Sequence, residues 1–206
     1  CKAITVCNKI PSRLFRISFS GELAYEIAVP TRYGNSLFET LMEAGEEYNV
    51  TPYGTEALGV MRVEKGHAAG NELTGQTTAQ NLGLEKMMSK QKDYIGNILS
   101  KRVELNRENK IILMGFKPVD KTIELLAGSH FISKGKTACT DNDEGWMSSV
   151  AFSPILNHSI GLGFIKNGSN RIGEIVTAVD LLRNKQIDVE IVSPHFVDPE
   201  GEKLRA

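Results

Sequence analysis

The sequence has few of the features that assign a protein to a class at once. Among its 206 residues are only three cysteines, Cys1, Cys7 and Cys139, which are scattered and show no CxxC spacing. They indicate neither a disulfide framework nor a zinc site, and they are typical of reduced thiols, so we expect a cytoplasmic protein. No run approaches the roughly 18 apolar residues of a membrane span, and we expect no membrane association.

An excess of charge of one sign is also lacking. Lysine and arginine number 24 against 25 aspartates and glutamates, the formal net charge is −1, and no long basic stretch occurs. Nucleic-acid binding draws on clustered basic residues, so we expect no nucleic-acid partner. Residue 1 is not methionine, and the charged-then-apolar order of a secretory signal is absent. We therefore expect a piece of a longer protein, whose preceding part supplies some of any active site.

Near its start the sequence contains two alternating runs with a glycine between them. Residues 13–20 place Phe15, Ile17 and Phe19 on one face, and residues 25–30 alternate again up to Pro30. This period of two is typical of half-buried strands, and Gly21 interrupts it, so the pattern predicts a β-hairpin.

Two glutamates of this hairpin need an explanation. Glu22 falls in the expected turn and Glu26 inside the second strand. The alternation alone favours a solvent-facing Glu26, because the other face of its strand carries the apolar residues. If Glu26 or the similarly surrounded Glu64 were buried, its carboxylate would have to be paired or hydrogen-bonded, for example by adjacent N–H donors of a ligand.

The period then changes to that of helices. Apolar residues at helical spacing predict a helix from about residue 33 to 47, and a second helix begins at Thr55 and ends at Gly66. The polar stretch 67–81 is long for a structureless connection, and such loops are usually functional or ordered by a neighbour. Residues 93–103 predict one more short helix.

The highly charged stretch 104–110 separates this part from one without helical periodicity. Short apolar runs follow between turns, at residues 111–116, 145–152, 161–165, 175–181 and 187–192. They predict an antiparallel barrel or sandwich. The fold class is therefore α+β, with one domain over residues 1–107 and an all-β domain over residues 108–206.

Residue patterns alone identify no catalytic centre. The isolated histidines have no partner at ligand spacing, so no metal site is expected; they are His67, His130, His158 and His195. The pair Ser148-Ser149 lacks the context of a nucleophile elbow. Residues 161–168, "GLGFIKNG", lack the third glycine of a dinucleotide fingerprint. Arg62 and Glu64 point to different sides of their helix and should not pair.

Longer segments carry a resemblance to a known family. They are "FRISFSGELAYEIAVP", "YGTEALGVMRVEKGHAAGNELTGQTTAQNLGL", "KQKDYIG", "MSSVAFSPILNHSIGLGFI" and "PHFVDPEGEKLR". In order and spacing, over nearly the whole chain, they resemble the C-terminal part of the α subunits of heterotetrameric sarcosine oxidases. More distantly they resemble the aminomethyltransferase, or T-protein, of the glycine cleavage system. The family binds tetrahydrofolate.

The resemblance implies a ferredoxin-like folate-binding region followed by a jelly-roll-like barrel. It also implies a reaction in which sarcosine becomes glycine and the one-carbon unit is captured as 5,10-methylenetetrahydrofolate. Tetrahydrofolate would be the cofactor and the other oxidase subunits the partners, while flavin and NAD would be bound elsewhere. Nothing in these residues looks like a flavin or NAD site.

Four positions match the family's folate-binding residues. The hairpin supplies Phe19, Glu22 and Glu26, of which the last hydrogen-bonds the pterin ring in the family, and the second helix supplies Arg62. The carboxylate chemistry fits, because the pterin edge presents parallel N–H donors and its flat ring packs against aromatic side chains.

The sequence also departs from the T-protein pattern. A folate-contacting arginine of the T-protein falls on Leu58, and a tyrosine near its C-terminus is replaced in the tail. The catalytic aspartate of the family lies before this hairpin, so we expect this stretch alone to be inactive. The alternatives that remain are a T-protein-like aminomethyltransferase and a non-catalytic piece that keeps the fold. A folate-binding relative in iron–sulfur cluster assembly is disfavoured, because residues 65–71 contain no cysteine.

Overall fold

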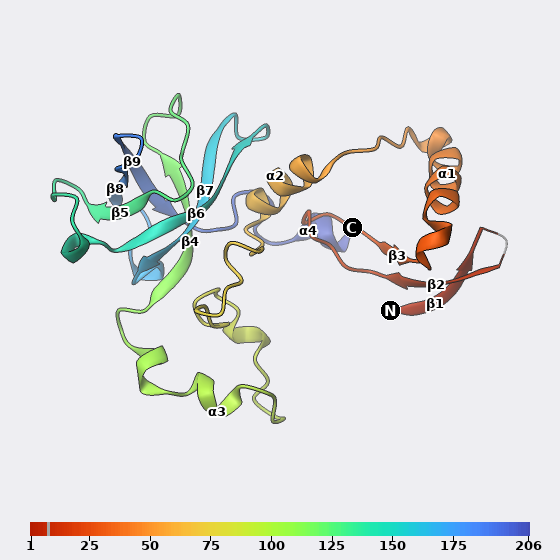
Figure 1. Ribbon diagram of the computed structural model, residues 1–206, viewed down its shortest axis with the longest axis horizontal. Coiled ribbons are helices and arrows are strands. Elements are labelled where there is room, and N and C mark those ends of the chain that lie inside the picture. Colours follow the sequence, from red (N-terminus) through yellow and green to blue (C-terminus); the bar gives the residue numbers. More distant parts are fainter. Residues whose placement is uncertain (8) are drawn as a thin grey trace. The chain divides into compact units, whose positions relative to one another are not determined.

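The structure is a computed structural model that describes residues 1–7 and 9–206. It divides into two compact units, the first comprising residues 1–61 and 200–206 and the second residues 62–199. Figure 1 shows the elements. The strands are β1 Lys2–Val6, β2 Ile10–Phe15, β3 Glu26–Ala28, β4 Ile111–Pro118, β5 His130–Ser133, β6 Gly145–Ser153, β7 His158–Lys166, β8 Ile175–Asp180 and β9 Lys185–Val192. The α-helices are α1 Gly34–Gly45, α2 Thr55–Lys65, α3 Asn97–Ser100 and α4 Glu202–Arg205.

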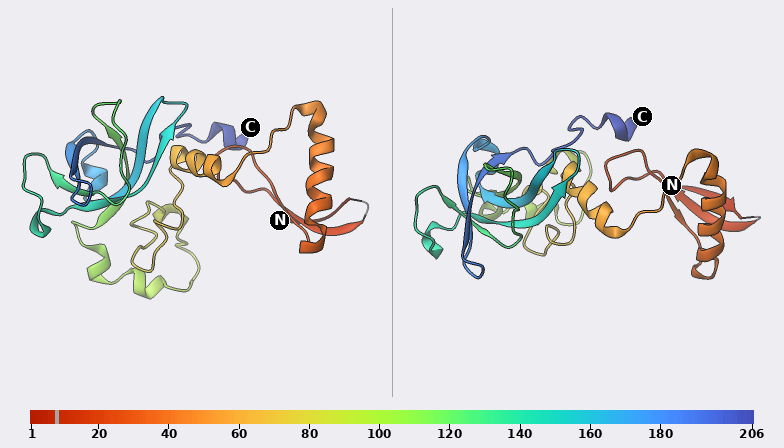
Figure 2. Two further views of the ribbon diagram at one scale, coloured as in Figure 1. Left: turned by 45° about the horizontal axis from the view of Figure 1, so that its top comes forward. Right: turned by 90° about the horizontal axis from the view of Figure 1, so that it is seen from above.

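The first unit is built around an antiparallel sheet in the order β1-β2-β3. In its register Leu14 is opposite Ile27, and Phe15 is opposite Glu26. Side chains that face each other across two strands share one side of the sheet, so these pairs lie on opposite sides. Helix α1 covers the side of Leu14 and Ile27, since both line a cavity together with Leu37 of the helix. Figure 2 shows this helix alongside the sheet in two views.

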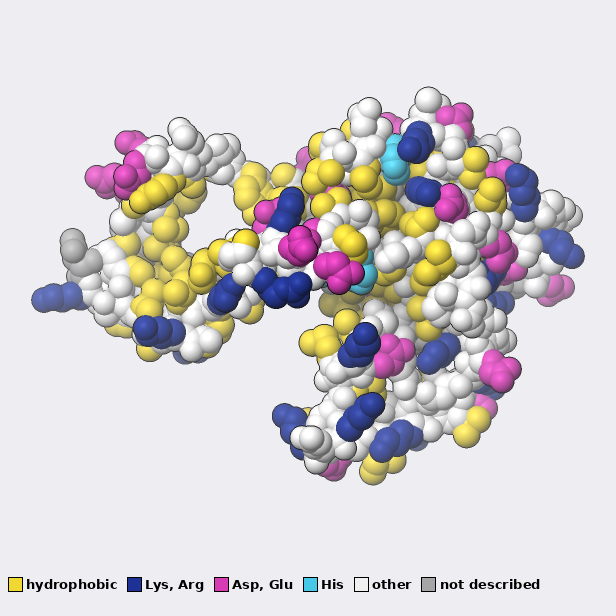
Figure 3. Space-filling model, turned by 180° about the vertical axis from the view of Figure 1, so that it is seen from behind, with side chains coloured by type: hydrophobic (Ala, Val, Ile, Leu, Met, Phe, Trp, Pro, Cys, Tyr) yellow, Lys and Arg dark blue, Asp and Glu magenta, His cyan; other side chains and the backbone are white. Residues whose placement is uncertain are grey.

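The other side of this sheet is open. Arg13, Glu26 and Ala28 are exposed on it, and Phe15 is half-buried. Throughout the described residues, every buried hydrophobic side chain belongs to the second unit. Apolar side chains therefore reach the surface of the first unit (Figure 3), where Tyr25 and Phe38 are each 55% exposed.

The second unit is centred on a closed barrel of six antiparallel strands in the order β4-β7-β6-β5-β8-β9. Its interior is apolar, and the stacked rings of Phe116 and Phe131, with centroids 4.1 Å apart, lie within it. Closure pairs every strand on both edges, which satisfies the backbone hydrogen bonds without an exposed edge. The barrel is thus the principal hydrophobic core of the chain.

Helix α2 ends against the segment that follows β9. Gly66 has φ +77° and ends the helix in the left-handed conformation that the sequence predicts. The backbone N–H groups of Phe196 and Val197 donate to the Glu64 carbonyl at 2.9 and 3.0 Å. Lys65 Nζ lies 3.0 Å from Asp198 Oδ2. These contacts satisfy a carbonyl at the C-terminus of the helix and neutralise a buried lysine.

The α+β class and the C-terminal barrel are confirmed. All five apolar runs expected to be strands are strands of the barrel; β5 was not expected, because it is only four residues long. The first hairpin strand ends at Phe15 rather than at residue 20. Residues 93–103 form an α-helix only over Asn97–Ser100, after Gly96 with φ +91°, and Val103 begins a 3-10 helix that ends at Asn106. The predicted boundary between residues 107 and 108 lies within the second unit and stays a prediction. None of the helices in the described ranges is long and apolar enough to cross a membrane.

Candidate functional site

The hairpin loop, residues 16–25, contains two predicted site residues, and a third, Glu26, directly follows it. It begins after β2 and ends at β3, and it contains Phe19, which is 39% exposed, and Glu22. The loop carries its own turn, because the Gly21 N–H donates to Ser18 Oγ at 3.0 Å and Gly21 has φ +86°. This turn replaces the ladder hydrogen bonds that a continuous strand would have made.

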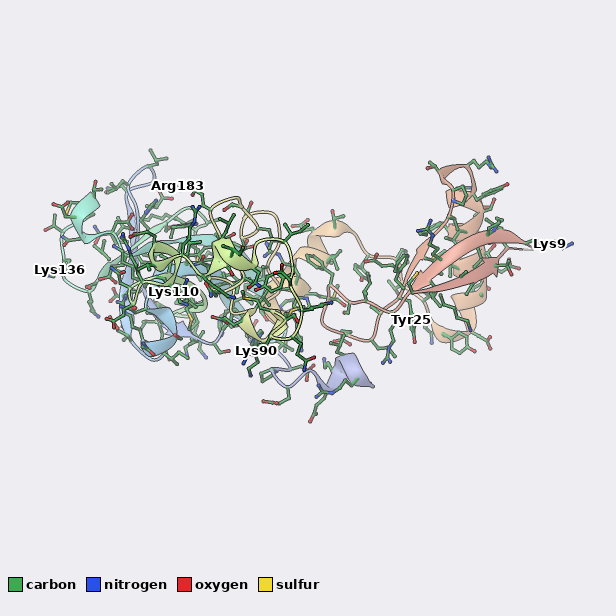
Figure 4. The ribbon with its side chains drawn as sticks, turned by 90° about the horizontal axis from the view of Figure 1, so that it is seen from below. Lys9, Tyr25, Lys90, Lys110, Lys136 and Arg183 are labelled. Atoms are coloured by element: carbon green, nitrogen blue, oxygen red, sulfur yellow. The ribbon has the colours of Figure 1, made fainter. Side chains whose placement is uncertain are left out.

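Glu26 begins β3 at the base of this loop, next to Tyr25, which Figure 4 labels. It is exposed, as the alternation alone predicts, and its carboxylate makes no hydrogen bond or ion pair with a described residue. Phe15 is its cross-strand partner and therefore lies beside it on the open side of the sheet. A carboxylate without a protein partner beside an aromatic ring can accept hydrogen bonds from a flat ligand that packs on that ring.

The apolar cavity of the first unit is a separate feature. It is open to solvent, has a volume of about 620 Å³ and is lined by Leu14, Leu23, Ala24, Tyr25, Ile27, Leu37 and Leu41. Tyr25 and Ile27 flank Glu26 in the chain, and successive side chains of a strand point to opposite sides. The cavity therefore lies on the α1 side of the sheet, and the Glu26 carboxylate faces away from it.

Glu22 is held by the C-terminal segment. Its Oε1 atom lies 3.1 Å from Lys203 Nζ, and the Leu23 N–H donates to the Lys203 carbonyl at 3.1 Å. Both charged side chains are about half exposed, at 54% and 50%, so this ion pair is a surface interaction. The structure thus gives Glu22 a partner within the chain, and its predicted folate contact stays a prediction.

Arg62 lies in the second unit, where it is part of a buried polar network. Its Nη1 atom lies 3.1 Å from Glu72 Oε2, and Nη2 donates to Ser149 Oγ at 2.7 Å. Glu72 is fully buried, and its carboxylate also accepts from Ser148 Oγ at 2.5 Å, from Ser149 Oγ at 2.6 Å and from the Ala69 N–H at 2.8 Å. The network fixes the loop after α2 to strand β6.

This network gives Arg62 a structural role that residue patterns did not indicate. The guanidinium satisfies a carboxylate that would otherwise be buried without a counter-charge. The long polar stretch 67–81 is correspondingly ordered by its neighbours, one of the two outcomes expected for it. The assignment of Arg62 to folate stays a prediction. Only the position of Glu72 within a family-like segment could have drawn attention to it, since a glutamate in a polar loop is ordinarily exposed.

Glu64 and two of the histidines considered as candidates make hydrogen bonds within the second unit. Glu64 is 5% exposed and accepts from Ser153 Oγ at 2.5 Å, so it does not pair with Arg62, as expected. The ring of His158 lies 2.8 Å from the Ser159 carbonyl and that of His195 2.9 Å from the Lys65 carbonyl. Over the described ranges no group of three or more metal-ligating side chains occurs.

A cluster at the rim of the barrel shifts the pKa values of its members. Arg171 Nη2 lies 2.7 Å from both Glu174 Oε1 and Glu144 Oε2. The hydrogen bonds from Arg171 lower the pKa of the Glu174 carboxyl and, in return, raise the pKa of the Arg171 guanidinium. Each charge stabilises the ionised form of the other, which is the signature of a structural ion pair.

Comparison with known proteins covers both units. Residues 1–92 match the family described as "GCVT N-terminal domain", and residues 113–198 match the "Glycine cleavage T-protein C-terminal barrel domain". The sarcosine oxidase subunit alpha of Rhizobium meliloti is 42% identical over 93% of this chain and 20% of its own length. That of Corynebacterium sp. (strain U-96) is 39% identical over 97% of this chain and 21% of its own length.

An aminomethyltransferase of Thermoanaerobacter pseudethanolicus is 31% identical over 88% of this chain and 47% of its own length. The crystal structure of the glycine cleavage system aminomethyltransferase T of Bartonella henselae has the same fold, with a TM-score of 0.71 and 23% identity over 90% of this chain and 50% of that one. This chain thus spans about a fifth of the length of the oxidase relatives and about half that of the aminomethyltransferases. With both domain matches in order along it, the chain belongs to the glycine cleavage T-protein family.

Proposed function

We propose that this chain is the tetrahydrofolate-binding, one-carbon-accepting part of a sarcosine oxidase α chain. The observation that carries the proposal is the 42% identity to a sarcosine oxidase subunit alpha over 93% of the chain. In this reaction a flavin bound elsewhere would accept a hydride from the N-methyl group of neutral sarcosine, which leaves an iminium ion. This chain would hold tetrahydrofolate, whose two amine nitrogens would take up the iminium carbon. The C–N bond to glycine would break, and the two N–H protons lost from tetrahydrofolate would leave with glycine, one of them on its nitrogen as the ammonium form and one in place of the broken bond, so that 5,10-methylenetetrahydrofolate is the second product.

The hairpin supports a folate role for its own residues. The pterin ring is flat and carries adjacent N–H groups on one edge, and an ionised carboxylate accepts two such donors at once. Glu26 has its carboxylate exposed and without a protein partner among the described residues, with the Phe15 ring next to it. Phe19 lies in the adjoining loop. We propose Glu26 as the residue that holds the pterin, with Phe15 and Phe19 packing against the ring.

A T-protein-like aminomethyltransferase is the second candidate, and the 31% identity to such enzymes favours it. In that reaction the one-carbon unit comes from an aminomethyl carrier rather than from an imine made by a flavin. Leu58, where the T-protein pattern has a folate-contacting arginine, and the higher identity to the oxidase subunits favour the first candidate. A non-catalytic chain that keeps only the fold would bind no folate.

The proposed partners and location follow from the proposal that the chain is part of a sarcosine oxidase. The partners would be the other sarcosine oxidase subunits, the flavin and NAD would be bound in other domains or subunits, and the location would be the cytoplasm. No nucleic-acid partner is proposed, because the net charge is −1.

Calorimetric titration of the full-length protein with 5-formyltetrahydrofolate tests the proposal. Replacing Glu26 with glutamine keeps the shape and removes the charge, so we expect folate binding to weaken by about 1.5–3 kcal/mol, the value of a hydrogen bond to a charged group. Glu43→Gln is the matched control, because Glu43 is exposed on α1, which covers the other side of the sheet.

Two results would contradict the proposal. A wild-type protein without measurable folate binding refutes the folate function as a whole. Equal affinities of Glu26→Gln and Glu43→Gln refute only the assignment of Glu26. Release of glycine from sarcosine with formation of 5,10-methylenetetrahydrofolate separates the oxidase from the aminomethyltransferase.

A further inference from the structure

The C-terminal segment, residues 200–206, belongs to the first unit although the chain before it forms the second. It contains α4, a single helical turn, preceded by the buried Gly201 with φ +67°. A left-handed conformation of this kind favours glycine, and it directs the backbone into α4. The last residues of the chain therefore belong to the same unit as its first 61 residues.

Hydrogen bonds of Lys203 join the C-terminal segment to the hairpin loop. The Leu23 N–H donates to the Lys203 carbonyl at 3.1 Å, and Lys203 Nζ lies 3.1 Å from Glu22 Oε1, across a separation of 181 residues. One contact uses the backbone of the loop and the other a side chain. Together they fix two consecutive loop residues, Glu22 and Leu23, just before β3.

The hairpin loop also has contacts near it in the sequence. Its second half lines the apolar cavity with Leu23, Ala24 and Tyr25, beside Leu37 of α1. Its first half has the turn of Ser18 and Gly21, and its base is closed by the pairing of Phe15 with Glu26. Between Gly21 and Glu26 the chain has no strand or helix. Lys203 adds hydrogen bonds from a distant part of the sequence to the residues just before Glu26.

We propose that residues 200–206 act as a clasp, in which Lys203 is a positioning residue that holds the hairpin loop in its ligand-binding conformation. This proposal rests on the proposed folate function, because the clasp would order the folate site. A loop that is already ordered loses less conformational entropy when a ligand binds. Loss of the clasp should therefore weaken folate binding without changing the stability of the barrel.

Charge reversal across the ion pair tests this. The single variants Lys203→Glu and Glu22→Lys place like charges together, and the double variant restores an opposite pair. We expect each single variant to speed amide hydrogen exchange of Leu23 about two- to fivefold, the range for an exposed ion pair, and the double variant to reverse the change. Lys185→Glu, an exposed lysine of β9, controls for the change in net charge.

The same variants are then titrated with 5-formyltetrahydrofolate in the full-length protein. We expect Lys203→Glu to raise the dissociation constant two- to fivefold relative to Lys185→Glu, while the thermal midpoint of the barrel stays constant. Exchange of Leu23 that is unaffected by both single variants overturns the clasp, whatever folate does. If the single variants speed exchange of Leu23 and the double variant reverses this, but the wild-type protein binds no folate, the proposed function is refuted. The clasp then remains only as a contact that orders the loop.

Discussion

Replacing Glu72 with glutamine should destabilise the second unit strongly. The carboxylate is fully buried and takes part in four contacts, with Arg62, Ser148, Ser149 and the Ala69 N–H. A neutral amide keeps one acceptor oxygen and leaves the Arg62 guanidinium, whose side chain is 12% exposed, without its counter-charge. Losing about two hydrogen bonds to a charged group, with some recovery as the serine hydroxyls rotate, gives about 3 kcal/mol.

Urea denaturation followed by the fluorescence of Trp146 measures this loss. Trp146 is the single tryptophan of the chain and lies in β6, two residues before Ser148, so its signal reports the second unit. With a urea dependence of about 2 kcal/mol per molar, we expect the midpoint to fall by about 1.5 M. Glu190→Gln is the matched control, because its pair with Lys117 is about one-third exposed and should contribute at most about 1 kcal/mol. A Glu72→Gln midpoint no lower than that of Glu190→Gln refutes the reasoning.

Two further predictions concern the second unit and use the same denaturation assay. Gly66→Ala adds a Cβ atom 2.3 Å from the Pro194 carbonyl oxygen at a φ of +77°, and it should destabilise more than Gly173→Ala, where φ is +89° and the space is open; equal losses would show that the contact is irrelevant. The hydrogen bond from Arg171 lowers the pKa of Glu174 in the folded protein, so the stability it provides is present above the unfolded pKa of about 4.3 and is lost as the pH falls through the folded pKa. The midpoint difference between wild type and Arg171→Gln should therefore shrink from pH 7 to pH 3.5, and a constant difference would contradict this origin.

The barrel was largely predictable because its strands carry a local pattern. Residues 187–192 alternate between apolar and polar side chains, and residues 161–165 contain only glycines and apolar side chains, as is typical of strands that close on a core. The strand β5 was missed because four residues, one of them His130, show too short a pattern. Local periodicity thus predicts those strands in which buried side chains recur at regular spacing over several residues.

The candidate site was predictable only in part, because its contacts are non-local. The alternation continues to Phe19, yet the strand ends at Phe15, where the turn of Ser18 and Gly21 takes over. The partner of Glu22 is Lys203, 181 residues away, and no single-sequence pattern indicates such a pair. Phe15 was assigned to the apolar side of a strand, whereas the register shows it beside Glu26.

The contacts at the end of α2 also determine when this part of the chain can finish folding. Lys65 and Asp198 are 133 residues apart in sequence. At a synthesis rate of about 5–20 residues per second, the ribosome needs about 7–27 s after adding Lys65 before it adds Asp198. During that interval Lys65 lacks its carboxylate partner, and the Glu64 carbonyl lacks the two N–H groups that later bind it. The last barrel strand, β9, ends at Val192, so these contacts of Glu64 and Lys65 form only after all barrel strands have been synthesised.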